Sequence, residues 1–139
     1  MAEYIYLIAP ISGWVVAQSI KFALTLRKEG VKIQDAVQSG GMPSSHTAFM
    51  VALTTVIGLN LGISDVIFGV CFAVTGVIIY DALGVRRTTG QQTVAIKKLA
   101  LSSKTKINTL DNAKGHTLPE VAVGALVGVG VGIVLYNLL

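Results

Sequence analysis

Residues 121–139 read VAVGALVGVGVGIVLYNLL and contain no charged side chain. A helix needs about 20 consecutive apolar residues to cross the hydrocarbon core of a bilayer. This stretch has that length. A small soluble domain buries only about two-thirds of the surface that its unfolded chain exposes, so it could not hide several stretches of this kind. The stretch therefore predicts a membrane-spanning helix.

Three further apolar runs occupy residues 4–26, 46–63 and 66–83, and the last span becomes 120–139 when Glu120 is included. Backbone groups inside lipid must be hydrogen-bonded within the chain, so all four runs are expected to be helices. The composition agrees, with 53% hydrophobic and 13% charged residues and a mean hydropathy of +0.70. We predict an all-α polytopic membrane protein, a single domain over residues 1–139 that forms a bundle of four transmembrane helices.

The basic residues gather in the loops after the first and third spans. Among them are Arg27, Lys28, Lys32, Arg86, Arg87, Lys97, Lys98, Lys104, Lys106 and Lys114. The excess of cations in cytoplasmic loops predicts that both loops face the cytoplasm of a multi-pass cell-membrane protein. Recruitment of basic residues by an anionic substrate would produce the same asymmetry. Because the charges lie in two stretches, we expect no nucleic-acid binding.

Residues 91–101, in the loop between the third and fourth spans, mix apolar residues with Gln92, Lys97 and Lys98. Such a mixture is typical of a short interfacial helix that lies on the membrane surface. A solvated helix is the alternative interpretation.

Three glycines of the last span, Gly124, Gly128 and Gly132, lie four residues apart. They share one helix face and let another helix approach closely. The partner is either another helix of the bundle or a second copy in a homodimer.

Three polar clusters interrupt the apolar chain, and the first is SGGMPSSH at residues 39–46. Pro43 suits a first helical turn, and Ser44 or Ser45 can cap the helix. A helix N-terminus offers free N–H groups to a phosphate. Ordinary capping is the alternative interpretation of this cluster.

The second cluster is YDALGVRR at residues 80–87. Paired arginines such as Arg86 and Arg87 can grip a phosphate with bidentate hydrogen bonds. They could equally be anchors at the membrane edge, with Asp81 as their salt-bridge partner or as the group that orients them.

The third cluster is GHTLPE at residues 115–120. His116 and Glu120 are four residues apart and share a helix face. A carboxylate that holds one imidazole nitrogen leaves the other free to attack. His46 and Asp81 could join this pair to hold a divalent cation, but the surrounding fixed positive charge favours an anion. We therefore predict no metal and no cofactor.

The three clusters, GGMPSSHTA (40–48), YDALGVRR (80–87) and GHTLPEV (115–121), resemble the signatures of the divergent type-2 phosphatidic acid phosphatase family. That group is related to acid phosphatases and vanadium-dependent haloperoxidases. Gln18 and Lys21 of the first span also look like the family. Two positions depart from the pattern of the wider superfamily. Ser45 replaces a glycine, and Leu110 stands where an arginine is expected.

The resemblance implies that His116 is a nucleophile, His46 the general acid and Glu120 the orienting carboxylate. We expect phosphate to be bound by Lys21, Ser44, Ser45, Arg86 and Arg87, with support from Gln18 and Asp81.

The resulting hypothesis is an integral membrane phosphatase. It would hydrolyse a phosphate monoester or diphosphate of a phosphorylated lipid or polyprenyl substrate, without metal, through a phosphohistidine. Two alternatives remain. One is a membrane protein that binds or transports an anionic lipid or phosphate headgroup without cleaving it. The other is a small scaffold packed through its glycines.

Overall fold

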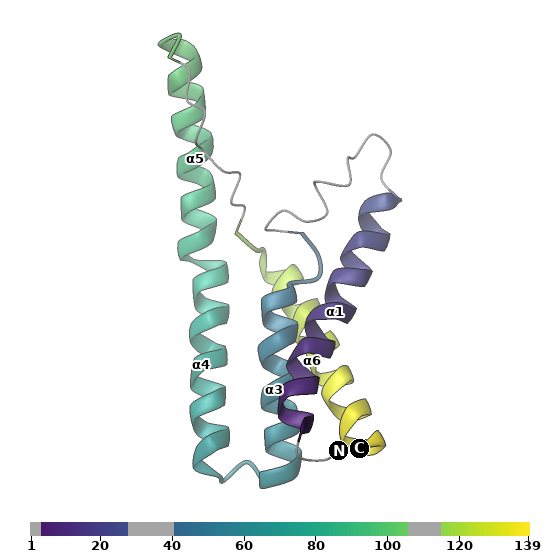
Figure 1. Ribbon diagram of the computed structural model, residues 1–139. Helices are drawn as coiled ribbons and strands as arrows, with labels where there is room; N and C mark the ends of the chain where they lie inside the picture. The colour runs from purple at the N-terminus through teal and green to yellow at the C-terminus, as the bar shows by residue number, and fades with distance from the viewer. Residues whose placement is uncertain (1–3, 28–40, 106–114) are drawn as a thin grey trace.

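The structure is a computed structural model that describes residues 4–27, 41–105 and 115–139, apart from the side chains of Arg86 and Arg87. All regular secondary structure in these ranges is helical (Figure 1). The helices are α1 (Ile5–Leu26), α3 (Ser45–Leu61), α4 (Val66–Leu83), α5 (Val85–Ser102) and α6 (Leu118–Leu138).

The four predicted apolar runs correspond to α1, α3, α4 and α6 within two residues at every boundary. Within the described ranges, three helical segments are long and apolar enough to cross a membrane: α1, α6 and the segment that begins with α4. α3, with 17 residues, is shorter than the usual span. The all-helical class is confirmed, and a count of four transmembrane helices stays a prediction.

Helix α3 lies at the centre of the bundle and contacts α1, α4 and α6. Its buried Ala48 and Ala52 are small enough for neighbouring backbones to come close. A Cβ added at Gly13 of α1 would lie 2.7 Å from the carbonyl oxygen of Ala48. Helices in a membrane are held together by such close packing, because lipid supplies no hydrophobic force between them.

The glycine face of α6 packs within the same bundle. Gly124, Gly128 and Gly132 are all buried against α3. An added Cβ would lie 2.5 Å from the carbonyl oxygen of Ser44 at Gly124, and 2.8 Å from that of Ala48 at Gly128. Of the two partners left open by the sequence, the structure therefore gives these glycines to α3.

This packing predicts that alanine substitutions at two glycines of α6 have very different effects on stability. Gly128→Ala should lower the free energy of unfolding by about 1–3 kcal/mol, because the methyl group overpacks the backbone of α3. Gly130 is the matched control, since an added Cβ there meets nothing within 4 Å. Gly130→Ala should leave stability unchanged or slightly raised. Denaturant unfolding in detergent micelles measures both variants, and equal destabilisation by the two would refute the close contact.

The short connection between α3 and α4 reverses the chain. Gly62 adopts φ +90°, a backbone conformation that favours glycine. Asp65 caps α4 by accepting a hydrogen bond from the N–H of Ile67 at 2.7 Å. This turn lies at the same end of the bundle as both chain termini (Figure 1), as the antiparallel arrangement of the helices requires.

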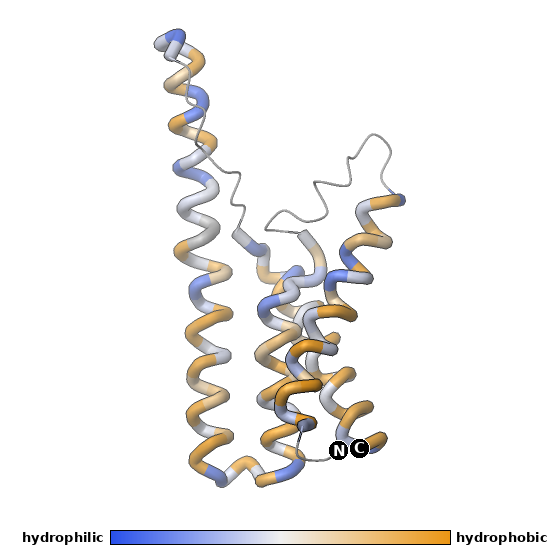
Figure 2. The backbone as a smooth tube through the Cα atoms, viewed as in Figure 1, coloured by the Kyte–Doolittle hydropathy of each residue, from blue (hydrophilic) through white to orange (hydrophobic). Residues whose placement is uncertain are grey.

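Helix α5 is longer than the predicted interfacial helix and begins at Val85, directly after α4. It continues nearly in the direction of α4, beyond the ends of the other helices (Figure 1). The colouring changes there from mostly hydrophobic in α4 to mixed in α5 (Figure 2). The placement of this helix at the membrane surface stays a prediction.

Candidate functional site

The first turn of α6 builds the core of the site. Thr117 is the N-cap, and the Glu120 carboxylate reaches back to it, so that Oε2 accepts the Thr117 N–H at 2.9 Å. This is the carboxylate half of a capping box, which satisfies an N–H group that has no partner within the helix. Capping of α6 is therefore enough to explain the position of the Glu120 side chain.

The same oxygen of Glu120 also contacts His116. Nδ1 of His116 lies 3.2 Å from Oε2, and the two side chains are 7% and 19% exposed. A carboxylate acceptor favours a proton on Nδ1, which leaves the lone pair of the ring on Nε2. The predicted pairing of His116 and Glu120 is thus present in the structure.

A backbone contact places His116 against α4. Its N–H donates to the carbonyl oxygen of Ala82 at 3.1 Å. Ala82 is buried and belongs to the last turn of α4. The start of α6 is therefore tied to the end of α4, which sets the position of the imidazole relative to the second polar cluster.

A cavity of about 250 Å³ lies between the ends of these helices. Both histidines of the chain line it, His46 from the first turn of α3 and His116 from the segment before α6. The other lining residues are Phe49, Met50, Ile78, Asp81 and Ala82. The structure thus brings His46, His116 and Asp81 together from three separate segments, at the end of the bundle opposite the termini.

Lys21 approaches the site from α1. It is only 7% exposed, and its Cε would lie 3.3 Å from a Cβ added at Gly41. Gly41 has φ +88°, so the backbone passes over the lysine in a conformation that favours glycine. Lys21 also interacts electrostatically with Glu120. A buried ammonium and the carboxylate of the histidine pair therefore share one neighbourhood.

Ser44 takes the capping role that the sequence offered as one of two alternatives. It is the N-cap of α3, so Pro43 lies before the helix and not in its first turn. Its N–H donates to the carbonyl oxygen of Glu120 at 3.0 Å, and its Oγ lies 2.9 Å from Thr47 Oγ1. It is fully buried. The Ser44 N–H is therefore used to join α3 to α6, which removes it as a donor to phosphate.

The remaining predicted residues are Ser45, Gln18, Arg86 and Arg87. Ser45 is buried at the start of α3. Gln18 lies one turn before Lys21 on α1, and its buried Oε1 has no hydrogen-bond partner among the described residues. Arg86 and Arg87 belong to the first turn of α5, but their side chains lie outside the described part of the chain.

The apolar residues that line the cavity were not predicted from the sequence. Phe49 and Met50 follow His46 at three and four residues, and Ile78 precedes Asp81 by three. Residues at these spacings share a helix face. The apolar residues three or four positions from His46 and Asp81 were therefore the sequence signal that could have predicted this lining.

Metal binding receives no geometric support within the described ranges, where no three His, Cys, Asp or Glu residues form a group that could hold an ion. His46 and Asp81 line the cavity together with His116, while Glu120 is absent from its lining.

Comparison with known proteins agrees with the sequence signatures. A family model described as the divergent PAP2 family matches residues 3–131. The chain is also 34% identical over 112 residues to YuiD, an uncharacterized membrane protein of Bacillus subtilis (strain 168). The match covers 70% of this chain and 71% of that relative. No solved structure matches.

Proposed function

This chain belongs to the divergent PAP2 family, and we propose that it is a membrane phosphatase that acts on a lipid-like phosphate monoester or diphosphate. The observation that carries the proposal is the His116–Glu120 pair, buried beside a cavity that His46 also lines. A held imidazole and a second imidazole across a cavity are the groups that a two-step phosphoryl transfer needs.

In the first step, Nε2 of His116 attacks phosphorus in line with the leaving oxygen. The N–P bond forms as the P–O bond breaks, and protonated His46 gives its proton to the departing oxygen. In the second step, neutral His46 takes a proton from water as the water oxygen attacks phosphorus. The N–P bond breaks, phosphate leaves, and both histidines return to their starting states.

Cations would stabilise the charge on the three equatorial oxygens of the transferring group, which is usually the largest catalytic contribution. We assign this role to Lys21, Arg86 and Arg87, supported by Gln18 and Asp81. Ser45 is a further candidate donor through its backbone. We also propose that this end of the bundle faces the cytoplasm, because the basic loops lie there.

A non-catalytic binder is the second candidate function. The Ser44 N–H is committed to the Glu120 carbonyl oxygen, so the site has fewer donors for transition-state charge than the sequence predicts. Such a site could still hold an anionic headgroup through Lys21.

Phosphate release distinguishes these functions. The purified full chain in detergent micelles is offered phosphatidic acid, phosphatidylglycerophosphate and a polyprenyl diphosphate, with and without a chelator. We expect release from at least one substrate at an unchanged rate in chelator. Saturable binding of vanadate without turnover would support the binder, whereas loss of turnover on chelation would contradict the metal-independent mechanism.

A further inference from the structure

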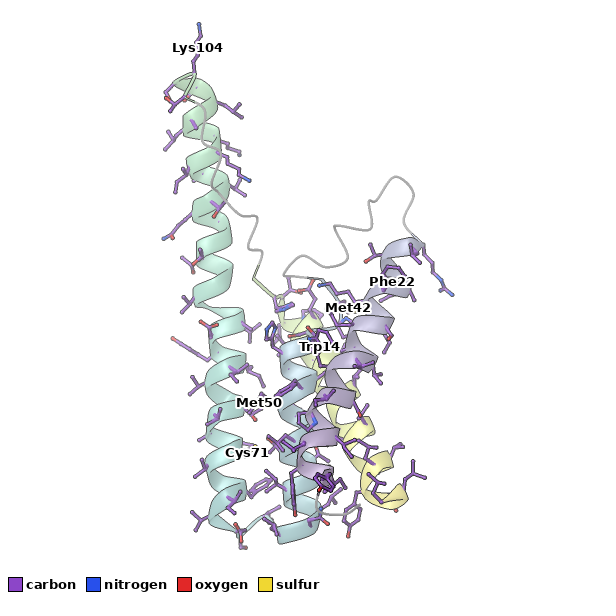
Figure 3. The ribbon with its side chains drawn as sticks, in the orientation of Figure 1. Trp14, Phe22, Met42, Met50, Cys71 and Lys104 are labelled. Carbon is purple, nitrogen blue, oxygen red and sulfur yellow. The ribbon has the colours of Figure 1, made fainter. Side chains whose placement is uncertain are left out.

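The cavity changes from polar to apolar along the helix axes. His46 and Asp81 lie at the end of the bundle, whereas Met50 and Ile78 lie about one turn further in on the same two helices. Four residues of helix rise by about 6 Å. Figure 3 shows Met50 in this region, beside the gap between α3 and α4. If a phosphate group lies between the histidines, the first carbon atoms attached to it would contact apolar side chains.

About one turn beyond Met50 and Ile78, α3 and α4 are joined by a buried contact. Thr54 Oγ1 donates to the carbonyl oxygen of Met50 at 2.8 Å and lies 2.9 Å from Thr75 Oγ1. Cys71 Sγ lies 3.1 Å from the same hydroxyl oxygen. Because the two helices are in contact here, we expect a long substrate tail to leave the cavity sideways into the surrounding lipid.

The cavity encloses only the part of a lipid next to its phosphate. Its volume of about 250 Å³ is slightly below the range of roughly 300–1,000 Å³ that is typical of ligand pockets. In a diacylglycerol phosphate, the first carbons after the phosphate carry ester groups. Phe49, Met50, Ile78 and Ala82 offer these esters no side-chain donor. An ester carbonyl buried there would lose its hydrogen bonds to water without gaining a partner.

We infer that the preferred substrate is a prenyl-type phosphate or diphosphate, whose chain is hydrocarbon from the first carbon onward. This inference rests on the proposed phosphatase function and narrows its substrate. The walls formed by Phe49, Met50 and Ile78 contact the first isoprene unit, the histidines hold the phosphate, and the rest of the chain lies in the membrane.

Binding tests the substrate class independently of hydrolysis. The His116→Ala variant, which cannot turn substrate over, is titrated in micelles with farnesyl phosphate and with dioctanoyl phosphatidic acid. We expect a Kd about tenfold lower for farnesyl phosphate, which corresponds to roughly 1.4 kcal/mol. Equal or tighter binding of phosphatidic acid overturns the inference. If the preference holds while the parent protein releases no phosphate, only the proposed hydrolysis fails.

Two adjacent residues of α4 provide a matched pair of variants. Ile78 lines the cavity, whereas Val77 is 68% exposed and does not. Ile78→Trp should weaken farnesyl phosphate binding at least tenfold and leave competition by vanadate unchanged. Val77→Trp should stay within twofold of the parent. Unchanged farnesyl phosphate binding in Ile78→Trp would overturn the assignment of the apolar wall.

A polar substitution tests the same wall without adding bulk. Met50→Gln places an amide donor where an ester carbonyl of phosphatidic acid would lie. The preference for farnesyl phosphate should then fall about tenfold, through tighter binding of phosphatidic acid. A preference that stays at its parental value would mean that this wall does not select the substrate.

Discussion

Replacing His116 with alanine should lower phosphate release by about a thousandfold or more, because it removes the nitrogen that forms the covalent intermediate. His116 is buried and its neighbours are held by backbone hydrogen bonds, which do not depend on the imidazole. The readouts are the rate of phosphate release and the acid-labile phosphoenzyme trapped with labelled substrate. Both should disappear together.

His46 supplies the contrasting variant, since the chain has only two histidines. His46→Ala removes a general acid but keeps the nucleophile. Its rate of phosphate release should fall about a hundredfold with an alkoxide leaving group. With p-nitrophenolate, which leaves without protonation, the rate should fall much less. If His116→Ala kept a phosphoenzyme, or if the two variants responded alike to the leaving group, the assigned roles would be wrong.

Glu120→Gln should lower turnover by about a hundredfold while the fold is kept. The glutamine amide oxygen can still accept the Thr117 N–H, so the helix cap survives. The negative charge that stabilises an imidazolium-like ring at His116 is lost, however, and the ring becomes a weaker nucleophile. Phosphate release measures the fall in turnover, and denaturant unfolding in micelles checks that the fold is kept.

Glu120→Ala separates the two roles of this carboxylate. It removes the cap as well as the charge, so it should also lower the free energy of unfolding by about 1 kcal/mol. A Glu120→Gln variant with the parental rate would show that Glu120 is only a cap. The orienting role assigned to it would then have to be abandoned.

Much of the fold follows from the local sequence. The runs that became α1, α3, α4 and α6 are predictable because a helix in lipid must satisfy its own backbone, so apolar length alone defines the element. The His116–Glu120 contact is equally local, because four residues of separation bring two side chains to one helix face. Helix α5 shows the limit, since its mixed composition does not determine its direction.

The site beyond α6 was only partly predictable. The sequence left Ser44 as either a helix cap or a phosphate ligand, and the close approach of α3 and α6 directs its N–H to the Glu120 carbonyl oxygen. That approach depends on Gly124, 80 residues away in the chain. Phe49 and Ile78 gained their place beside the histidines only because the start of α3 and the end of α4 line one cavity.

The sequence by itself determined the membrane class, the helices and the residues of the histidine pair, because hydrophobic length and helical spacing act over a few turns. Only the tertiary structure decided which N–H groups remain available, that Lys21 is buried beside Gly41, and where hydrocarbon lines the cavity. Those outcomes depend on how closely separate helices approach. Small residues such as Ala48 and Gly128 permit that close approach. Each needs a second helix, far away in the chain, to pack against.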